Sequence, residues 1–181
     1  MRITYNAPVV LTYALISIGV LFLNNLFHPG LIKQFFVVYP HVRFSDPIQC
    51  FRLVSHIAGH ASWDHLLSNF SLILLIGPLL EEKYGSRKLF EMIVVTALIT
   101  GLLNAFFFST GLLGASGIAF MLILLGSFSN IKAGEAPLTF LIVAALFLGG
   151  ELIAGMKRDH ISQFAHLIGG GMGAFYGFFR V

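Results

Sequence analysis

Long stretches without a charged side chain divide this sequence into hydrophobic segments. They cover residues 3–32, 65–80, 92–131, 136–150 and 160–179. A membrane-spanning helix needs about 20 mostly apolar residues. The stretch 92–131 is 40 residues long and is interrupted by Ser109-Thr110-Gly111, so it predicts two spans joined by a tight turn. The whole pattern predicts six spans, at residues 9–27, 65–83, 88–108, 116–131, 137–156 and 164–180.

These spans are expected to be helices, because no water reaches the bilayer core and a helix satisfies its backbone groups internally. The fourth span has only 16 residues, which suits the centre of a bundle where neighbouring helices shield its ends from lipid. We therefore predict an all-α membrane protein, one domain over residues 1–181. It is a bundle of six transmembrane helices with a short central fourth helix.

The segment 28–64 is too long and too mixed for a simple connection, because apolar pieces alternate with charged residues and prolines. We predict a structured first loop that lies partly in the membrane interface. Only Arg2 precedes the first span and no small-x-small site follows it, so we expect an uncleaved helix rather than a signal peptide.

Six spans place both termini on the same side of the membrane. With the N-terminus inside, the short outer loops hold only Lys157 and Arg158. The inner segments then hold most of the basic residues, namely Arg2, Lys83, Arg87, Lys88, Lys132 and Arg180. This distribution predicts a multi-pass protein of the cell membrane with a cytoplasmic N-terminus.

The composition supports a membrane protein and excludes other classes. Apolar residues make up 57% of the chain and charged residues 10%, and the mean hydropathy is +0.87. A soluble domain of this size cannot bury so much apolar surface. The composition therefore excludes a soluble enzyme, a disordered chain and a protein that reads nucleic acid. The single cysteine, Cys50, excludes an internal disulfide.

Two polar residues inside predicted spans are candidates for a catalytic pair. Ser116 lies in Gly114-Ala115-Ser116-Gly117 at the start of the fourth span. The glycines leave room around its hydroxyl, and the free N–H groups of a helix start can stabilise an oxyanion. His166 lies near the start of the sixth span, where the small-xxx-small spacing of Gly169 and Gly173 predicts close approach to the fourth helix. Ser116 and His166 would then form a nucleophile–base dyad.

Structural readings of both residues stay open. A serine in a membrane helix often bonds a carbonyl of the preceding turn, and a histidine can make an interhelical hydrogen bond. No carboxylate is placed to complete a triad, so a dyad is the simplest catalytic reading.

Further histidines precede or begin the second span. His65 and Asn69 are four residues apart and share a helix face, from which both can donate to a developing oxyanion. Alternatively, they line a water-filled entry. His56 and His60 are expected to tie the loop to backbone carbonyls. The three histidines could instead bind zinc, but no His-Glu-x-x-His motif is present, so we expect no metal and no cofactor.

Together these residues resemble the rhomboid family of intramembrane serine proteases. The resemblance runs from about residue 51 to 177, with six spans in the expected order. The motifs that carry it, in chain order, are Phe51-Arg52, His60-x4-His65-x3-Asn69, Glu81-Glu82-Lys83-Tyr84-Gly85-Ser86, Gly114-Ala115-Ser116-Gly117 and Ala165-His166-x2-Gly169-x3-Gly173.

The resemblance implies a role for each residue. Ser116 would be the nucleophile and His166 the general base. The Ser116 amide, His65 and Asn69 would form the oxyanion hole. The supporting residues would be Arg52, His60, Glu81, Gly114, Gly117, Phe120, Gly169 and Gly173, with Lys83 beside Glu81. A loop at about 157–163 would cover the cavity. Substrates would be transmembrane segments of membrane proteins, entering sideways from the bilayer near the fifth span.

Three residues depart from the family pattern. Phe51 stands where the family often has tryptophan, Phe120 where it often has an aromatic hydroxyl, and Lys83 where it has arginine, which alone forms a bidentate fork. Two other functions use the same fold and polar residues. One is a catalytically silent rhomboid-like binder of transmembrane clients, and the other is a transporter that uses the buried polar residues as its path.

Overall fold

The computed structural model describes residues 3–128, 138–139, 141–143, 145–146 and 160–179. Over these residues the chain is helical, and its one extended pairing is an antiparallel bridge between Val38 and Leu112. The helices are α1 (Pro8–Leu26), α2 (Leu31–Phe35), α3 (Pro47–Ser55), the 3-10 turn η1 (His56–Ala58), α4 (Trp63–Tyr84), α5 (Ser86–Phe107), α6 (Ser116–Ser127) and α8 (His160–Phe179).

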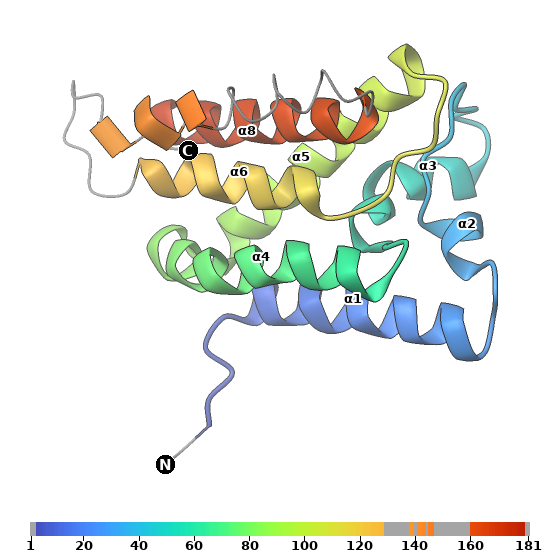
Figure 1. Ribbon diagram of the computed structural model, residues 1–181, viewed down its shortest axis with the longest axis horizontal. Helices are drawn as coiled ribbons and strands as arrows, with labels where there is room; N and C mark the ends of the chain where they lie inside the picture. Colours follow the sequence, from blue (N-terminus) through green and yellow to red (C-terminus); the bar gives the residue numbers. More distant parts are fainter. Residues whose placement is uncertain (1–2, 129–137, 140, 144, 147–159, 180–181) are drawn as a thin grey trace.

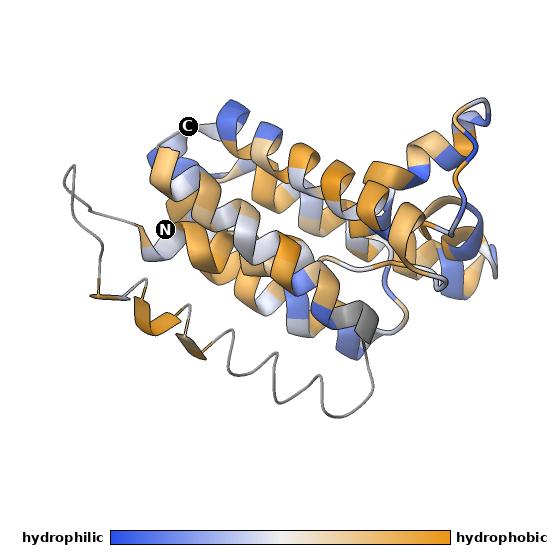
Figure 2. Ribbon diagram, turned by 90° about the horizontal axis from the view of Figure 1, so that it is seen from above, coloured by the Kyte–Doolittle hydropathy of each residue, from blue (hydrophilic) through white to orange (hydrophobic). Residues whose placement is uncertain are grey.

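Three of these helices, α1, α4 and α5, are long and apolar enough to cross a bilayer. Their outward faces remain apolar: Leu75 and Leu79 of α4 are 70% and 67% exposed. Leucines exposed to that extent on a long apolar helix match a lipid environment rather than water. Figure 2 shows hydrophobic residues over most of the helical surface, with hydrophilic ones gathered towards the helix ends. The chain is therefore an integral membrane protein.

The helices form a bundle with α4 and α6 near its centre. α1 packs on α4, α4 on α6, and α6 on α8, while α5 lies behind them (Figure 1). The first turns of α4, α6 and α8 lie at the end of the bundle that α2 and α3 cover. The start of α1 and the end of α8 lie at the opposite end.

Three predicted spans coincide with α1, α4 and α5, and the spans expected at 116–131 and 164–180 overlap α6 and α8 with different ends. Helix α8 begins at His160 rather than at 164, so residues 160–163 of the expected covering loop are helical. The hydrophobic pattern misses this first turn because it is polar, with His160, Ser162 and Gln163. Helix α6 ends at Ser127. Residues 129–131, most of the expected span 137–156, and residues 157–159 of the covering loop lie outside the described part of the chain.

Helix α3 and the segment before it form a folded outer cap. Asp46 caps α3 by accepting hydrogen bonds from the amides of Ile48 and Gln49. The cap sits close to α5, because a Cβ on Gly101 would lie 2.5 Å from the carbonyl oxygen of Leu53. A larger residue than glycine at 101 would therefore push α3 away from the bundle.

Glu81 connects three helices at the opposite end. Its buried carboxylate accepts hydrogen bonds from the amides of Val9 (2.9 Å) and Val10 (3.0 Å) in the first turn of α1, and from the hydroxyl of Ser86 (2.7 Å) at the start of α5. Helix N-terminal amides have no carbonyl partner within their own helix, and a carboxylate there also favours the helix dipole.

We expect Glu81→Ala to lower the free energy of unfolding by about 3 kcal/mol, because two amides of α1 lose a charged acceptor. The neighbouring Glu82 is exposed and supplies the matched control, Glu82→Ala, with an expected change within about 0.5 kcal/mol. Thermal unfolding of the detergent-purified protein measures both. Equal effects of the two substitutions would contradict the role of Glu81.

Candidate active site

The turn that leads into α6 is held by backbone pairing on one side. Val38 and Leu112 exchange two hydrogen bonds, of 3.0 and 2.9 Å. Two residues later the Gly114 amide donates to the His56 carbonyl oxygen at 3.0 Å. Gly114 has φ +114°, a conformation that favours glycine over any other residue. This backbone turn aims the chain so that α6 starts at Ser116.

His60 holds the next amide of the same turn. Its Nε2 accepts from the Ala115 amide at 3.3 Å, and its Nδ1 lies 3.4 Å from the Ala58 carbonyl oxygen. Nε2 can accept only when the proton is on Nδ1, so the ring is neutral in this arrangement. Ser116 itself is half-buried and opens the helix, where its amide has no carbonyl partner within α6.

The His65 and Asn69 side chains lie against this turn from α4. A Cβ placed on Gly114 would lie 2.8 Å from His65 Nε2 and 3.9 Å from Asn69 Nδ2. A side chain at position 114 would therefore collide with the His65 ring, whereas Asn69 would stay at an ordinary contact distance. Asn69 is 7% exposed, and its Nδ2 has no hydrogen-bond partner among the described residues.

Helix α8 approaches α6 through backbone contacts between small residues. A Cβ on Gly117 would lie 3.1 Å from the Ala165 carbonyl oxygen, and one on Gly169 would overlap the Gly117 carbonyl and fall 2.8 Å from the Gly117 Cα. Gly173 meets the Met121 backbone one turn further along. The close packing predicted by the small-xxx-small spacing is therefore present, with α8 against the short helix.

The two dyad candidates are sequence neighbours of the residues that make this contact, one on each helix. Ser116 precedes Gly117, and His166 follows Ala165, across the point where the two backbones meet. The imidazole of His166 also stacks on Phe120 of α6, with ring centroids 4.3 Å apart and planes tilted by 41°. Phe120 thus contacts the histidine ring although it lacks a hydroxyl.

Burial controls the charge of the loop histidines. Burial lowers the pKa of His60 to about 4, and the nearby His65 ring lowers it further in the same direction. Burial likewise lowers the pKa of His56 to about 4, and its Nε2 lies 3.4 Å from Thr100 Oγ1. No group of three or more metal-ligating side chains is present among the described residues.

We expect His60→Gln to lower the stability of the folded protein by the largest amount near neutral pH. Unfolded histidine has a pKa of about 6.5, so between pH 6.5 and about 4 the unfolded chain binds more protons than the folded one. Stability contributed by His60 is therefore present above this window and lost as the pH falls through it. The difference in Tm between wild type and His60→Gln should shrink from pH 7 to pH 4. The same substitution at exposed His41 is the control, and a pH-independent difference would contradict the prediction.

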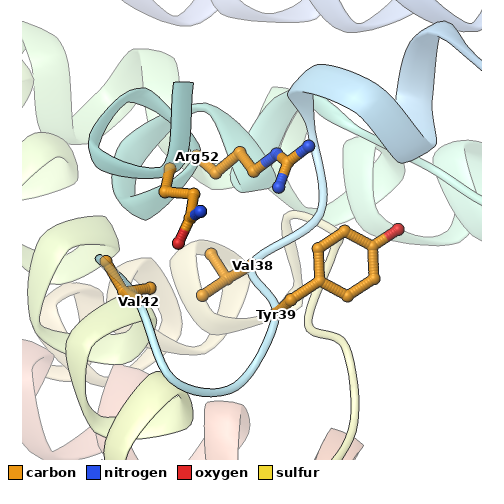
Figure 3. Close-up of a pocket in the computed structure, with 5 residues that line it drawn as sticks. Val38, Tyr39, Val42 and Arg52 are labelled. Carbon is orange, nitrogen blue, oxygen red and sulfur yellow. The ribbon is translucent and has the colours of Figure 1, made fainter. Parts of the chain in front are cut away.

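Arg52 belongs to the outer cap and not to the groups around Ser116. Its guanidinium donates to the Gln34 carbonyl oxygen from Nε at 2.8 Å and Nη2 at 2.6 Å, and it lies over the Tyr39 ring at 5.2 Å. Figure 3 shows Arg52 and Tyr39 at a small pocket whose lining also includes Val38, Val42 and Gln49. Arg52 thus ties α3 to the end of α2.

The structure brings His65, Asn69, Ser116, His166 and Phe120 to one place, and puts Glu81 and Arg52 at opposite ends of the bundle. Residue spacing alone does not reveal the bridge between Val38 and Leu112 or the contact of Thr100 with His56. Both partners are distant along the chain, and their residue types are common in any span. The sequence signal that could have indicated Thr100 is a polar residue on the buried face of a helix.

Comparison with known proteins gives consistent results. The sequence model of a family described as "Rhomboid domain" matches residues 47–181. The chain is 25% identical to "Rhomboid protease GlpG" of Haemophilus influenzae over 143 residues, which covers 77% of this chain and 74% of that protein. It is 30% identical to the protein of the same name from Serratia proteamaculans over 138 residues, covering 73% of this chain and 50% of that protein.

Proposed function

Because this chain belongs to the rhomboid family, we propose that it is an intramembrane serine endopeptidase that cleaves transmembrane segments of other membrane proteins. The observation that carries the proposal is the close backbone contact of α6 with α8 at Gly117, Ala165 and Gly169. That contact supports a pairing of Ser116 with His166, which follow or precede the contacting residues on the two helices. The two similar proteins named as proteases support the same activity.

In the proposed reaction Ser116 Oγ attacks the scissile carbonyl carbon while His166 takes the hydroxyl proton. His166 then returns a proton to the leaving amine as the peptide bond breaks. His166 next takes a proton from a water molecule, whose oxygen attacks the acyl carbon, and returns that proton to Ser116 Oγ as the ester bond breaks. Phe120, which packs against the imidazole at a tilt, would restrict rotation of the His166 ring during these proton transfers.

The oxyanion that forms in each step needs donors that are already in place. We assign this role to the Ser116 amide, the His65 ring and the Asn69 side-chain amide. Asn69 Nδ2 is buried and has no hydrogen-bond partner among the described residues, so within them it has no competing bond to break when the negative oxygen forms. No cofactor takes part in this mechanism.

The proposed topology follows the sequence pattern. The chain would cross the cell membrane six times with a cytoplasmic N-terminus, so that the first turns of α4, α6 and α8 lie near the outer face beneath the cap formed by α2 and α3. Substrate helices would reach Ser116 from the bilayer. Local unwinding would expose the scissile amide, because an intact helix keeps its carbonyls hydrogen-bonded.

The experiment that tests the proposal is labelling of the detergent-purified protein with a fluorophosphonate. A serine hydroxyl reacts at a useful rate only when a neighbouring base activates it. We expect a mass adduct on Ser116 of wild type that is lost in both Ser116→Ala and His166→Ala. Labelling repeated in lipid vesicles guards against inactivation by detergent.

The same experiment separates the alternatives. No adduct on folded wild type in either detergent or lipid would overturn the protease and favour a silent binder of transmembrane clients, whose client association would survive Ser116→Ala. Solute flux through vesicles that is unaffected by Ser116→Ala would favour a transporter instead.

A further inference from the structure

Two buried side-chain amide nitrogens lack a hydrogen-bond partner in the described part of the chain: Asn69 Nδ2 and Gln163 Nε2. The proposed mechanism uses the first as an oxyanion donor and leaves the second without a role. An N–H group removed from water without a partner destabilises a protein by about 1–3 kcal/mol. Such a group in a folded protein calls for an explanation, and a bound ligand that accepts from it is one.

Gln163 lies in the first turn of α8, three residues before His166. Residues three apart share a helix face, so Gln163 and His166 project to the same side of α8. The two residues between them face elsewhere. Phe164 packs against Phe108, the residue that follows α5, with ring centroids 4.3 Å apart. Ala165 packs in the apolar cluster with Val38, Leu53, Ala105 and Leu112.

The position of Gln163 along α8 matters as much as its face. Both α6 and α8 begin at the end of the bundle that the outer cap covers (Figure 1). Gln163 therefore lies nearer to that end than His166 by about one helical turn, which is roughly 5 Å. An extended polypeptide advances about 3.3 Å per residue. The span from the scissile bond to Gln163 thus corresponds to one or two substrate residues.

We propose that Gln163 Nε2 donates a hydrogen bond to a substrate backbone carbonyl one or two residues beyond the scissile bond, on the leaving-group side. His166 must hand a proton to the leaving amine, so the leaving-group side of the substrate has to lie against this face of α8. The ligand is an unwound, extended peptide segment, whose carbonyls are free to accept. This inference rests on the proposed protease function and adds a substrate-binding residue to it.

The test compares two reactions of the same serine. Gln163→Met keeps the length of the side chain and removes the donor. Leu167→Met is the matched control, because Leu167 lies one turn further along α8 and is 42% exposed. A fluorophosphonate expels only fluoride and has no polypeptide leaving group, whereas a transmembrane substrate protein in vesicles presents the carbonyl in question.

We expect Gln163→Met to lower kcat/KM for the transmembrane substrate about tenfold and to leave the fluorophosphonate labelling rate within twofold of wild type. Its Tm should equal or exceed that of wild type, since an unpartnered buried donor is removed. Leu167→Met should match wild type in all three measurements.

Three results would overturn this inference while leaving the proposed function in place. Unchanged cleavage by Gln163→Met would show that the substrate does not bind Gln163. An equal loss of cleavage and labelling would show that Gln163 positions His166 for both reactions and does not bind the substrate. A lower Tm together with lost cleavage would likewise indicate a purely structural residue. Wild type that neither labels nor cleaves would instead overturn the proposed function itself.

Discussion

Replacing Gly169 by alanine should separate α8 from α6 and abolish cleavage of transmembrane substrates. The added Cβ would overlap the carbonyl of Gly117, which is backbone inside a helix and cannot rotate away. Forcing atoms into a packed contact typically costs about 1–3 kcal/mol, and this clash lies at the upper end. A displacement of about 1 Å between reacting groups can lower a rate roughly 100-fold. We therefore expect a marked fall in Tm and a loss of cleavage activity of at least about 100-fold.

The glycine at 171 offers a control in the same helix. It is exposed, and a Cβ placed there meets no atom within 4 Å. Gly171→Ala should leave activity unchanged and raise stability by about 0.5–1 kcal/mol, because alanine favours the helix over glycine. Thermal unfolding and substrate cleavage of the two variants test the prediction together. A Gly169→Ala protein as stable and active as Gly171→Ala would mean that α6 and α8 do not meet at this point.

Replacing Asn69 by alanine should lower kcat by about 100- to 1000-fold, the usual effect of removing one oxyanion donor. The free protein should stay folded with little change in Tm, because the described residues offer Asn69 Nδ2 no hydrogen bond that the substitution would break. The rate of cleavage under saturating substrate and the Tm measure the two effects.

Ser68→Ala is the matched control for Asn69, since Ser68 is the preceding residue of α4 and is exposed. Its hydroxyl bonds only the His65 carbonyl oxygen among the contacts described, so activity should remain near that of wild type. Fluorophosphonate labelling adds a second check, because the phosphonyl oxygen also needs the oxyanion donors. Asn69→Ala should slow labelling as well as cleavage, and an unaffected labelling rate would remove Asn69 from the oxyanion hole.

Several features of the fold follow from local sequence. The ends of α1, α4 and α5 lie within two residues of the spans expected from uncharged stretches, because a bilayer demands a minimum apolar length and charges mark the limits. The spacing of Gly169 and Gly173 also indicates close helix packing. The hydrophobic pattern does not predict the first turn of α8. His160, Ser162 and Gln163 interrupt the run of apolar residues, but the helix continues through them.

Some residues of the candidate site could likewise be predicted from the sequence, and others could not. Ser116, His166, His65 and Asn69 could be selected from the sequence, because polar residues are costly in a span and their order resembles that of a known family. The supporting contacts could not be selected by type. The Ala115 amide that His60 holds, and the α1 amides that Glu81 holds, are backbone groups that every residue type supplies.

By itself the sequence determined that this chain is a helical membrane protein and which polar residues lie in or beside its hydrophobic segments. Hydrophobic length and residue type act locally and need no knowledge of distant neighbours. Only the tertiary structure decided which helices meet, that Gly114 leaves room for His65, and that Gln163 Nε2 is buried without a hydrogen-bond partner among the described residues. These properties depend on backbone approach between segments far apart in the chain, where a difference of one Cβ atom decides whether two helices touch.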